Sequence, residues 1–300
     1  MAQQVPIDAS ARPVEVEDKS VREVTADLAY QRHLIVNVVY CGPADAGEGN
    51  WVLIDAGVTD SAKRITETAA ARYGKHARPA AIILTHGHFD HVGAVRHLAE
   101  QWEVPVYAHP LEHPFLNGST SYPEPDPTVG GGMMAALSSL YPRGPVDVRQ
   151  WLEPLPEDGQ VPGLPGWRWI FTPGHTQGHI SLWRESDRTL IAGDAVITTA
   201  QESAYAVMLQ KVELHGPPMY YTEDWAAAKQ SARELAQLEP ELLLTGHGRA
   251  IQGQQMRDGL NRLVDQFDDI AMPAHVRDRP GSQAAHEPDR HATSRHSARG

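Results

Sequence analysis

Four side chains that can bind a metal fall close together in the segment THGHFDH, residues 85–91, directly after a continuous apolar run. In an extended segment, residues two apart point to the same side, so His86 and His88 can reach one ion together. Asp90 and His91 turn into the following segment and can face a second ion. Imidazole and carboxylate groups bind Zn²⁺ at about 2.0–2.2 Å. A His-rich polar loop without a metal is the alternative, and the spacing after a buried strand disfavours it.

Three later segments each present one further His or Asp where an apolar run ends. These residues are His175, Asp194 and His247, and each directly follows a glycine. Glycine at such a position permits positive φ and a close approach of backbone to a ligand. One such strand end would be weak support for a metal site. Together with the segment 85–91, however, four strand ends carry His or Asp, and this set predicts a common metal centre.

Together, these segments resemble the metallo-β-lactamase superfamily, whose pattern is His-x-His-x-Asp-His followed by a lone His, a bridging Asp and a final His. The resemblance spans about residues 20–265. It implies an α+β fold, the four-layer αββα sandwich, with the site at one edge. It assigns His86, His88 and His175 to a first metal, Asp90, His91 and His247 to a second, and Asp194 to a bridging position.

Asp55, in the segment VLIDAG, matches a conserved position of that family that supports the metal ligands. By this resemblance its carboxylate orients a ligand histidine by accepting the other ring N–H. An acid in a turn at the end of a strand is the alternative interpretation.

The implied cofactor is a pair of divalent metal ions, Zn²⁺ by preference, with Mn²⁺ or Fe²⁺ as alternatives. Two such ions lower the pKa of a bound water from 15.7 toward about 7, and the resulting hydroxide attacks a carbonyl carbon. Asp90 is the candidate to orient the nucleophile and to shuttle its proton. The expected enzyme is therefore a binuclear metallo-hydrolase.

Departures from the best-known members narrow the expected substrate. The best-known metallo-β-lactamases place Cys on the second metal, whereas Cys41 lies far upstream of every ligand motif. Ile197 stands where autoinducer lactonases carry Tyr. The pattern favours hydrolysis of an ester, lactone or thioester of a small, partly apolar molecule, in the manner of the glyoxalase II and lactonase branch. The alternative is a mononuclear-iron persulfide dioxygenase of the same fold; a β-lactamase or a non-catalytic metal-binding protein is less favoured.

Residues 109–166 interrupt the regular pattern with a Pro- and Gly-rich insert. Long irregular inserts are usually functional or disordered, so we weigh a substrate lid against a plain surface loop. The residues expected to face a substrate are Met133 and Met134 in this insert and Tyr220 and Tyr221 further along. His179 is expected to be a hydrogen-bonded structural histidine.

Apolar and β-branched runs predict strands, and helical spacing predicts helices. The predicted strands cover 21–28, 33–40, 51–54, 81–85, 104–108, 167–172, 179–183, 189–192 and 241–245. The predicted helices cover 60–73, 91–102, 133–141, 222–238 and 254–269. They suggest two packed sheets with helices outside. We expect a loose arm over 1–18, one domain over 19–272 and a disordered tail over 273–300.

The composition limits the partners of the protein. The 300 residues carry a formal net charge of −12, which argues against a nucleic-acid partner because phosphates need a basic surface. No apolar run approaches the roughly 20 residues that span a bilayer. A single cysteine and an N-terminus without the features of a signal peptide lead us to expect a cytoplasmic enzyme with a small-molecule substrate and no membrane partner.

Overall fold

The computed structural model describes residues 5–13, 16–18, 21–126, 129, 138–199 and 213–277. An eight-stranded sheet is formed by the first half of the chain, with the strands paired in sequence order from β2 to β9. The pairing is antiparallel up to β6 and parallel from β6 to β9. The strands are β2 (Val16–Asp18), β3 (Val21–Thr25), β4 (Leu28–His33), β5 (Val36–Cys41), β6 (Val52–Ile54), β7 (Ala81–Ile83), β8 (Val106–Ala108) and β9 (Leu152–Pro154).

A second sheet of five strands is formed by the later part of the chain, in the order β10-β11-β12-β14-β15. All its pairs are antiparallel except β12 with β14. Its strands are β10 (Trp167–Phe171), β11 (Ile180–Arg184), β12 (Thr189–Ile191), β14 (Leu242–Leu244) and β15 (Ile251–Gln252).

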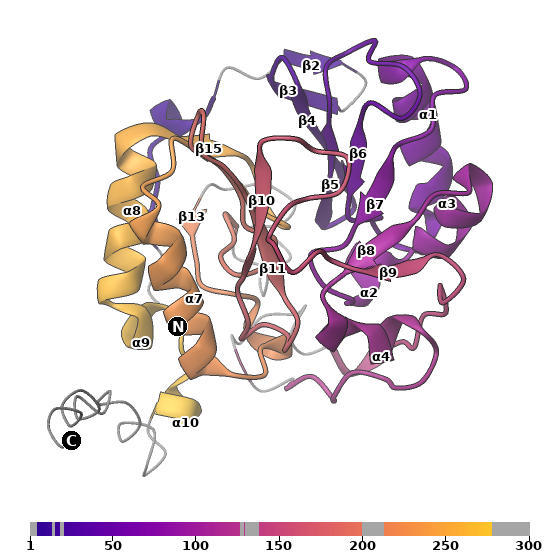
Figure 1. The fold of residues 1–300 in the computed structure, drawn as a ribbon. Helices are drawn as coiled ribbons and strands as arrows, with labels where there is room; N and C mark the ends of the chain where they lie inside the picture. Colours follow the sequence, from indigo (N-terminus) through magenta and orange to yellow (C-terminus); the bar gives the residue numbers. More distant parts are fainter. Residues whose placement is uncertain are drawn as a thin grey trace, which may run out of the picture.

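The two sheets pack face to face, and helices cover their outer faces (Figure 1). Buried side chains such as Ile83 and Leu244 fill the space between the sheets. Helices α1 (Ala62–Tyr73) and α3 (Val95–Trp102) pack on the first sheet, whereas α7 (Trp225–Gln237) and α8 (Gly253–Asp265) pack on the second. The predicted αββα sandwich is confirmed, because both sheets bury apolar side chains on two faces.

Short elements complete the described part of the chain. Within the described ranges, each helix is too short or too polar to cross a bilayer. The two-residue strands β1 (Val5–Pro6) and β13 (Glu213–Leu214) pair with each other, so part of the segment expected to be a loose arm lies beside α8. The remaining elements are η1 (Ala9–Ala11), η2 (Thr59–Ser61), α2 (Phe89–Val92), η3 (Pro110–Glu112), α4 (His113–Leu116), η4 (Ser138–Leu140), η5 (Met219–Tyr221), α9 (Phe267–Ile270) and α10 (Ala274–Arg277).

The strands predicted over 21–28 and 33–40 are wrong in their boundaries. The structure has three strands there, and β4 and β5 form a hairpin that turns at Leu34. Leu34 adopts a left-handed φ of 57° and is 73% exposed, which is unusual for an apolar residue. The apolar run HLIVNVVY therefore contains a turn that its composition does not indicate.

The helix predicted over 91–102 is wrong as one element, because α2 and α3 are separated at Gly93. The N–H of Gly93 donates to the carbonyl of Gly57 at 2.8 Å. A Cβ at Gly93 would lie 2.3 Å from the backbone nitrogen of Thr59. The helix is interrupted at Gly93, because the backbone there packs directly against the loop that contains Gly57 and Thr59.

The boundaries of the later helices also differ from prediction. Helix α7 begins at Trp225 and not at Thr222, because Asp224 accepts the N–H groups of Ala226 and Ala227 as the N-cap. The helix predicted over 254–269 is divided into α8 and α9 at Gln266. The helix predicted over 133–141 lies largely outside the described residues.

Candidate metal centre

All seven predicted ligands lie together where β7, β10, β12 and β14 end. Parallel strands end at the same edge of a sheet, and each of these strands leads directly into a ligand-bearing turn. Within each of three groups, the potential ligand atoms lie within 4.8 Å of one another. The groups are His86, His88 and His175; His86, His91 and Asp194; and Asp90, His91 and His247.

Buried polar atoms at the centre of this cluster fit a bound cation. Among the described residues, Nε2 of His86, Nε2 of His91 and Oδ1 of Asp194 are buried and have no hydrogen-bond partner. A buried polar atom without a partner costs free energy, so such atoms are rare in folded proteins. Two ring nitrogens and a carboxylate oxygen that converge in this way form a donor set that zinc-type ions accept.

Burial keeps the first group of histidines neutral, which is the form that binds a metal. Burial, followed by the neighbouring histidines, holds the pKa of His86 and of His88 well below the usual value. Burial also lowers the pKa of His175 to about 3, against the opposing effect of Asp194. Nδ1 of His88 lies 2.9 Å from Nε2 of His175, so the two rings converge on one point.

The second group is a network of carboxylates and imidazoles. Burial acts to lower the pKa of His91 and of His247, but Asp194 and other carboxylates raise both above the usual value. Burial acts to raise the pKa of Asp194, and His247 and His91 more than reverse it. Burial raises the pKa of Asp90, partly offset by the same two histidines. The two histidines favour the charged form of both carboxylates; they outweigh burial at Asp194 but not at Asp90.

The second ring nitrogen of most of these histidines is held by a neighbouring group, as metal-binding imidazoles usually require. Nδ1 of His91 lies 2.8 Å from Oδ2 of Asp55, the contact expected from the sequence. Nδ1 of His247 lies 2.7 Å from the carbonyl oxygen of Ile35, at the turn of the β4–β5 hairpin. The rings of His86 and His175 contact hydroxyl groups of Thr85 and Thr222.

His179 is a hydrogen-bonded structural histidine, as predicted. Its Nε2 accepts the backbone N–H of Asp194 at 2.9 Å, which places the proton on Nδ1. That nitrogen lies 3.1 Å from the carbonyl oxygen of Thr172. Burial lowers the pKa of His179 to about 4, so the neutral ring holds the Asp194 turn in place.

Glu112 is a supporting residue that the sequence analysis missed. Its carboxylate is fully buried and joins the two loops that carry the first group of histidines. One oxygen accepts the N–H of Gly87 at 2.9 Å and the hydroxyl of Tyr122; the other accepts the N–H of Gly178 and the hydroxyl of Thr176, both at 2.8 Å. Nothing in the Pro-rich insert distinguishes this acid from a solvated loop residue.

Glycine is required in two of the ligand turns. A Cβ at Gly246 would lie 2.0 Å from Oδ1 of Asp194 and 2.8 Å from Cε1 of His91. Gly193 has a φ of 53°, and a Cβ there would lie 2.7 Å from Nε2 of His179. These turns bring backbone against the ligand side chains, so the sequence signal of glycine before the ligand reflects steric need.

The residues expected to face a substrate are only partly described. The ring of Tyr221 packs on His88 with centroids 4.5 Å apart. Its hydroxyl oxygen is buried and has no hydrogen-bond partner among the described residues. Tyr220 is buried beside it, with ring centroids 5.1 Å apart. Met133 and Met134 lie outside the described residues.

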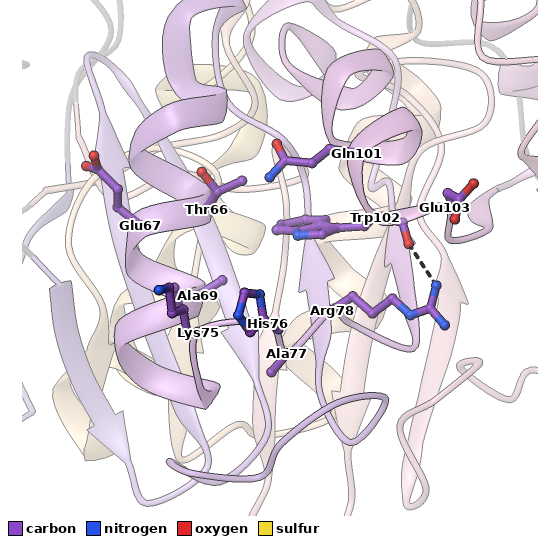
Figure 2. A pocket seen from close by; sticks show the side chains of 11 residues that line it. Thr66, Glu67, Ala69, Lys75, His76, Ala77, Arg78, Gln101, Trp102 and Glu103 are labelled. Carbon is purple, nitrogen blue, oxygen red and sulfur yellow. Dashed lines mark hydrogen bonds between the residues drawn. The ribbon is translucent and has the colours of Figure 1, made fainter.

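A separate hollow of about 420 Å³ lies on the outside of the first sheet, between α1 and the end of α3 (Figure 2). Figure 2 shows Trp102 at its centre, with the Arg78 guanidinium donating to the Trp102 carbonyl oxygen at 3.4 Å. None of the seven candidate ligands lines this hollow. It is therefore distinct from the metal centre.

Comparisons with known proteins agree with this architecture. The family model of the metallo-beta-lactamase superfamily matches residues 34–247. A Bacillus subtilis (strain 168) protein named probable metallo-hydrolase YflN is 50% identical over 221 residues, covering 74% of this chain and 84% of that protein. The di-iron-bound form of TTHA1623 is 27% identical with a TM-score of 0.51, covering 74% of this chain and 92% of that chain. A beta-lactamase domain protein from Burkholderia ambifaria shares the fold, with a TM-score of 0.59 at 22% identity, covering 86% of this chain and 80% of that chain.

Proposed function

This chain belongs to the metallo-beta-lactamase superfamily, and we propose that it is a two-metal hydrolase that cleaves an ester, lactone or thioester of a small molecule. Its 50% identity to a protein named a probable metallo-hydrolase supports a hydrolytic reaction. The convergence of seven buried His and Asp side chains carries the proposal, because it includes three polar atoms without a hydrogen-bond partner in the described part of the chain.

In the proposed arrangement, two metals share the seven ligands. His86, His88 and His175 would hold the first ion, and Asp90, His91 and His247 would hold the second. Asp194 would serve both ions, in keeping with its position within 3.5 Å of His91, His175 and His247. When bound, a pair of divalent ions supplies an acidified water and stabilises negative charge on a carbonyl oxygen.

The protein side chains bind, orient and move protons around this pair. We assign Asp90 to orient the attacking water and to accept its proton, because its buried carboxyl group lies beside His91 and His247 in the second ligand group. Asp55 fixes the ring of His91 through the contact at Nδ1. Tyr221 packs on His88 and carries an unpartnered buried hydroxyl, which we assign to hydrogen-bond the oxygen that becomes negative.

The proposed metals are zinc-type divalent ions. The donor set has only imidazole and carboxylate groups, and Cys41 is buried between the sheets with a pKa raised by burial. Such a set also suits iron and manganese. A relative of 27% identity is described in a di-iron-bound form, so Fe²⁺ belongs beside Zn²⁺ and Mn²⁺ in any test.

A mononuclear-iron dioxygenase of the same fold is the less supported alternative. Such an enzyme needs one iron held by two His and one Asp. Here Asp90, His91 and His247 form an additional complete group with ligand atoms within 4.8 Å of one another. A second ion would be the natural occupant of that group.

A substrate panel tests the proposed reaction. Aryl esters, lactones, thioesters and β-lactams are assayed with the Zn²⁺, Mn²⁺ and Fe²⁺ forms of the protein, together with oxygen uptake on glutathione persulfide. We expect hydrolysis of at least one ester, lactone or thioester, lost in His86→Ala. Oxygen uptake with one iron per chain, or full esterase activity in His86→Ala, would contradict the proposal.

A further inference from the structure

A pocket of about 240 Å³ adjoins the candidate metal centre at His88. Tyrosine rings form much of its wall. The rings of Tyr122 and Tyr221 each lie 4.5 Å from the ring of His88, centroid to centroid, and Tyr220 lines the pocket as well. A molecule in this pocket is therefore in reach of the metal-binding loop.

The pocket is built from two chain segments that are hydrogen-bonded to each other. The N–H of Asp126 donates to the carbonyl oxygen of Tyr220 at 2.9 Å. Tyr122 is fixed at the other end by its hydrogen bond to Glu112. Hydrogen bonds at both ends therefore hold the wall of the pocket in place.

The charge of the pocket is negative. Glu124, Asp126 and Glu223 line it, and the lining residues that the structure describes include no Lys or Arg. Two of these acids lie beside a basic side chain: Glu124 is 3.6 Å from Arg143, and Asp126 is 3.1 Å from His275. No such ion pair is found for Glu223 among the described residues.

Glu223 is the carboxylate in this pocket that a cationic ligand could pair with. Its Oε1 atom is buried and has no hydrogen-bond partner in the described part of the chain. Burial and, to a lesser extent, the nearby carboxylate of Glu112 raise the pKa of Glu223 to about 6. A hydrogen bond from the Gln177 side chain to the Glu223 carboxylate lowers the pKa and partly offsets these two effects. A half-buried carboxylate without a cation is unfavourable unless a partner arrives. Tyr221, which lines the same pocket, likewise carries a buried hydroxyl with no hydrogen-bond partner among the described residues.

We propose that this pocket binds a positively charged group of the substrate, an alkylammonium or quaternary ammonium, with Glu223 as its ion partner and tyrosine rings in its wall. Cations are attracted to the faces of aromatic rings, and aromatic cages with an acid suit quaternary ammonium groups. The inference rests on the proposed hydrolytic function and names its substrate class: a small ester or thioester that carries a cation. A substrate with a carboxylate in this position would be repelled.

An isosteric pair of esters tests the charge alone. Acetylcholine and 3,3-dimethylbutyl acetate have the same shape and differ in the cationic nitrogen. We expect kcat/KM of the wild-type protein to be about tenfold or more higher for acetylcholine, as one partly desolvated ion contact provides. In Glu223→Gln this ratio should fall several-fold toward one, because only the tyrosine rings and the two paired acids remain. Glu234→Gln on the exposed face of α7 removes the same charge away from the pocket and should keep the wild-type ratio. Equal rates for both esters in the wild type, or a ratio unchanged in Glu223→Gln, would overturn the proposal.

Ligand binding separates this proposal from the hydrolytic one. If neither ester is hydrolysed, the hydrolytic function fails on these substrates, and titration calorimetry with phenyltrimethylammonium chloride still tests the pocket. We expect saturable binding that weakens about tenfold in Glu223→Gln and persists in Glu234→Gln. Absence of binding at millimolar concentration, or equal affinity in Glu223→Gln, counts against the cation pocket whatever the esterase result.

Discussion

Nδ1 of His91 lies 2.8 Å from Oδ2 of Asp55, and the other carboxylate oxygen accepts the backbone N–H of Thr85 at 2.8 Å. One buried acid thus links the ring of a candidate ligand to the strand end that precedes His86. The contact leaves Nε2 of His91 facing the metal centre. Asp55 itself adopts a left-handed φ of 60°, a conformation that favours short polar residues and turns its carboxylate toward both partners.

Replacing Asp55 should therefore weaken metal binding more than it weakens the fold. In Asp55→Asn the His91 ring loses its charged acceptor, and we expect metal affinity to fall about 10–100-fold. Competition with a chromophoric chelator measures this directly. Asp60→Asn, an exposed acid five residues further along, is the matched control and should bind metal as the wild type does. Equal affinity in Asp55→Asn would show that this contact does not support the site.

Removing the carboxylate of Glu112 should affect both stability and the first metal position. In Glu112→Ala the N–H groups of Gly87 and Gly178 lose their buried acceptor. Each buried donor left unpaired costs about 1–3 kcal/mol, so we expect the loss of the two N–H partners to lower the free energy of unfolding by about 2–6 kcal/mol. Glu112→Gln keeps one acceptor oxygen and should lose less. Denaturant unfolding of the metal-free variants checks the order; unchanged stability in Glu112→Ala would refute the role.

The hydroxyl of Tyr221 should matter to turnover and not to substrate binding. If it donates to the developing negative charge, Tyr221→Phe should lower kcat about 10²-fold with KM nearly unchanged. Steady-state kinetics on the best ester of the panel provides the comparison. Tyr107→Phe, on strand β8, removes a hydroxyl that does not line the pocket beside His88 and serves as the control. A wild-type kcat in Tyr221→Phe would leave the ring as a packing group only.

His33 should make the stability of the metal-free protein depend on pH. Burial, with a contribution from Arg64, lowers the pKa of His33 to about 4, whereas its unfolded value is 6.5. The folded state thus favours the neutral ring. Stability is complete above pH 6.5 and is lost as the pH falls toward 4, because the unfolded chain binds the proton first. The loss from this group is about 3 kcal/mol over that window.

Unfolding curves of the wild type and of His33→Gln in chelator isolate this contribution. The difference between their free energies of unfolding should change by about 3 kcal/mol between pH 6.5 and pH 4, with the wild type losing more. Other buried histidines contribute equally to both proteins and cancel. If the free energies of unfolding of the two proteins change equally with pH, His33 does not titrate in this range.

Much of the fold could be predicted because both sheets are buried on two faces. Runs such as AIILT and ELLLT lead into ligand turns, and the structure places β7 and β14 there. The prediction of strand boundaries failed where a turn contained none of the residue types that usually mark turns. Leu34 in the β4–β5 hairpin is apolar and exposed, so nothing in its type marks a reversal. That same hairpin brings the Ile35 carbonyl to His247.

The candidate ligands were visible in the sequence, whereas their supports were visible only in part. His and Asp after a strand end form a local pattern, and so does Asp55. Glu112 and Tyr122 act through contacts with residues distant in sequence, Gly178 among them, that no local pattern encodes. Gly93 likewise looked like an ordinary helix interior, although the loop at Thr59 requires a residue without Cβ there. Such long-range contacts are decided by packing and not by spacing.

Metal content per chain tests the central claim most directly. Protein purified after exchange with Zn²⁺ is analysed by inductively coupled plasma mass spectrometry beside His247→Ala and His88→Ala, one variant for each proposed metal position. We predict about two equivalents for the wild type and about one for each variant, at circular dichroism equal to the wild type. A wild-type protein that is folded and retains no metal, or variants that bind as much as the wild type, would contradict the account.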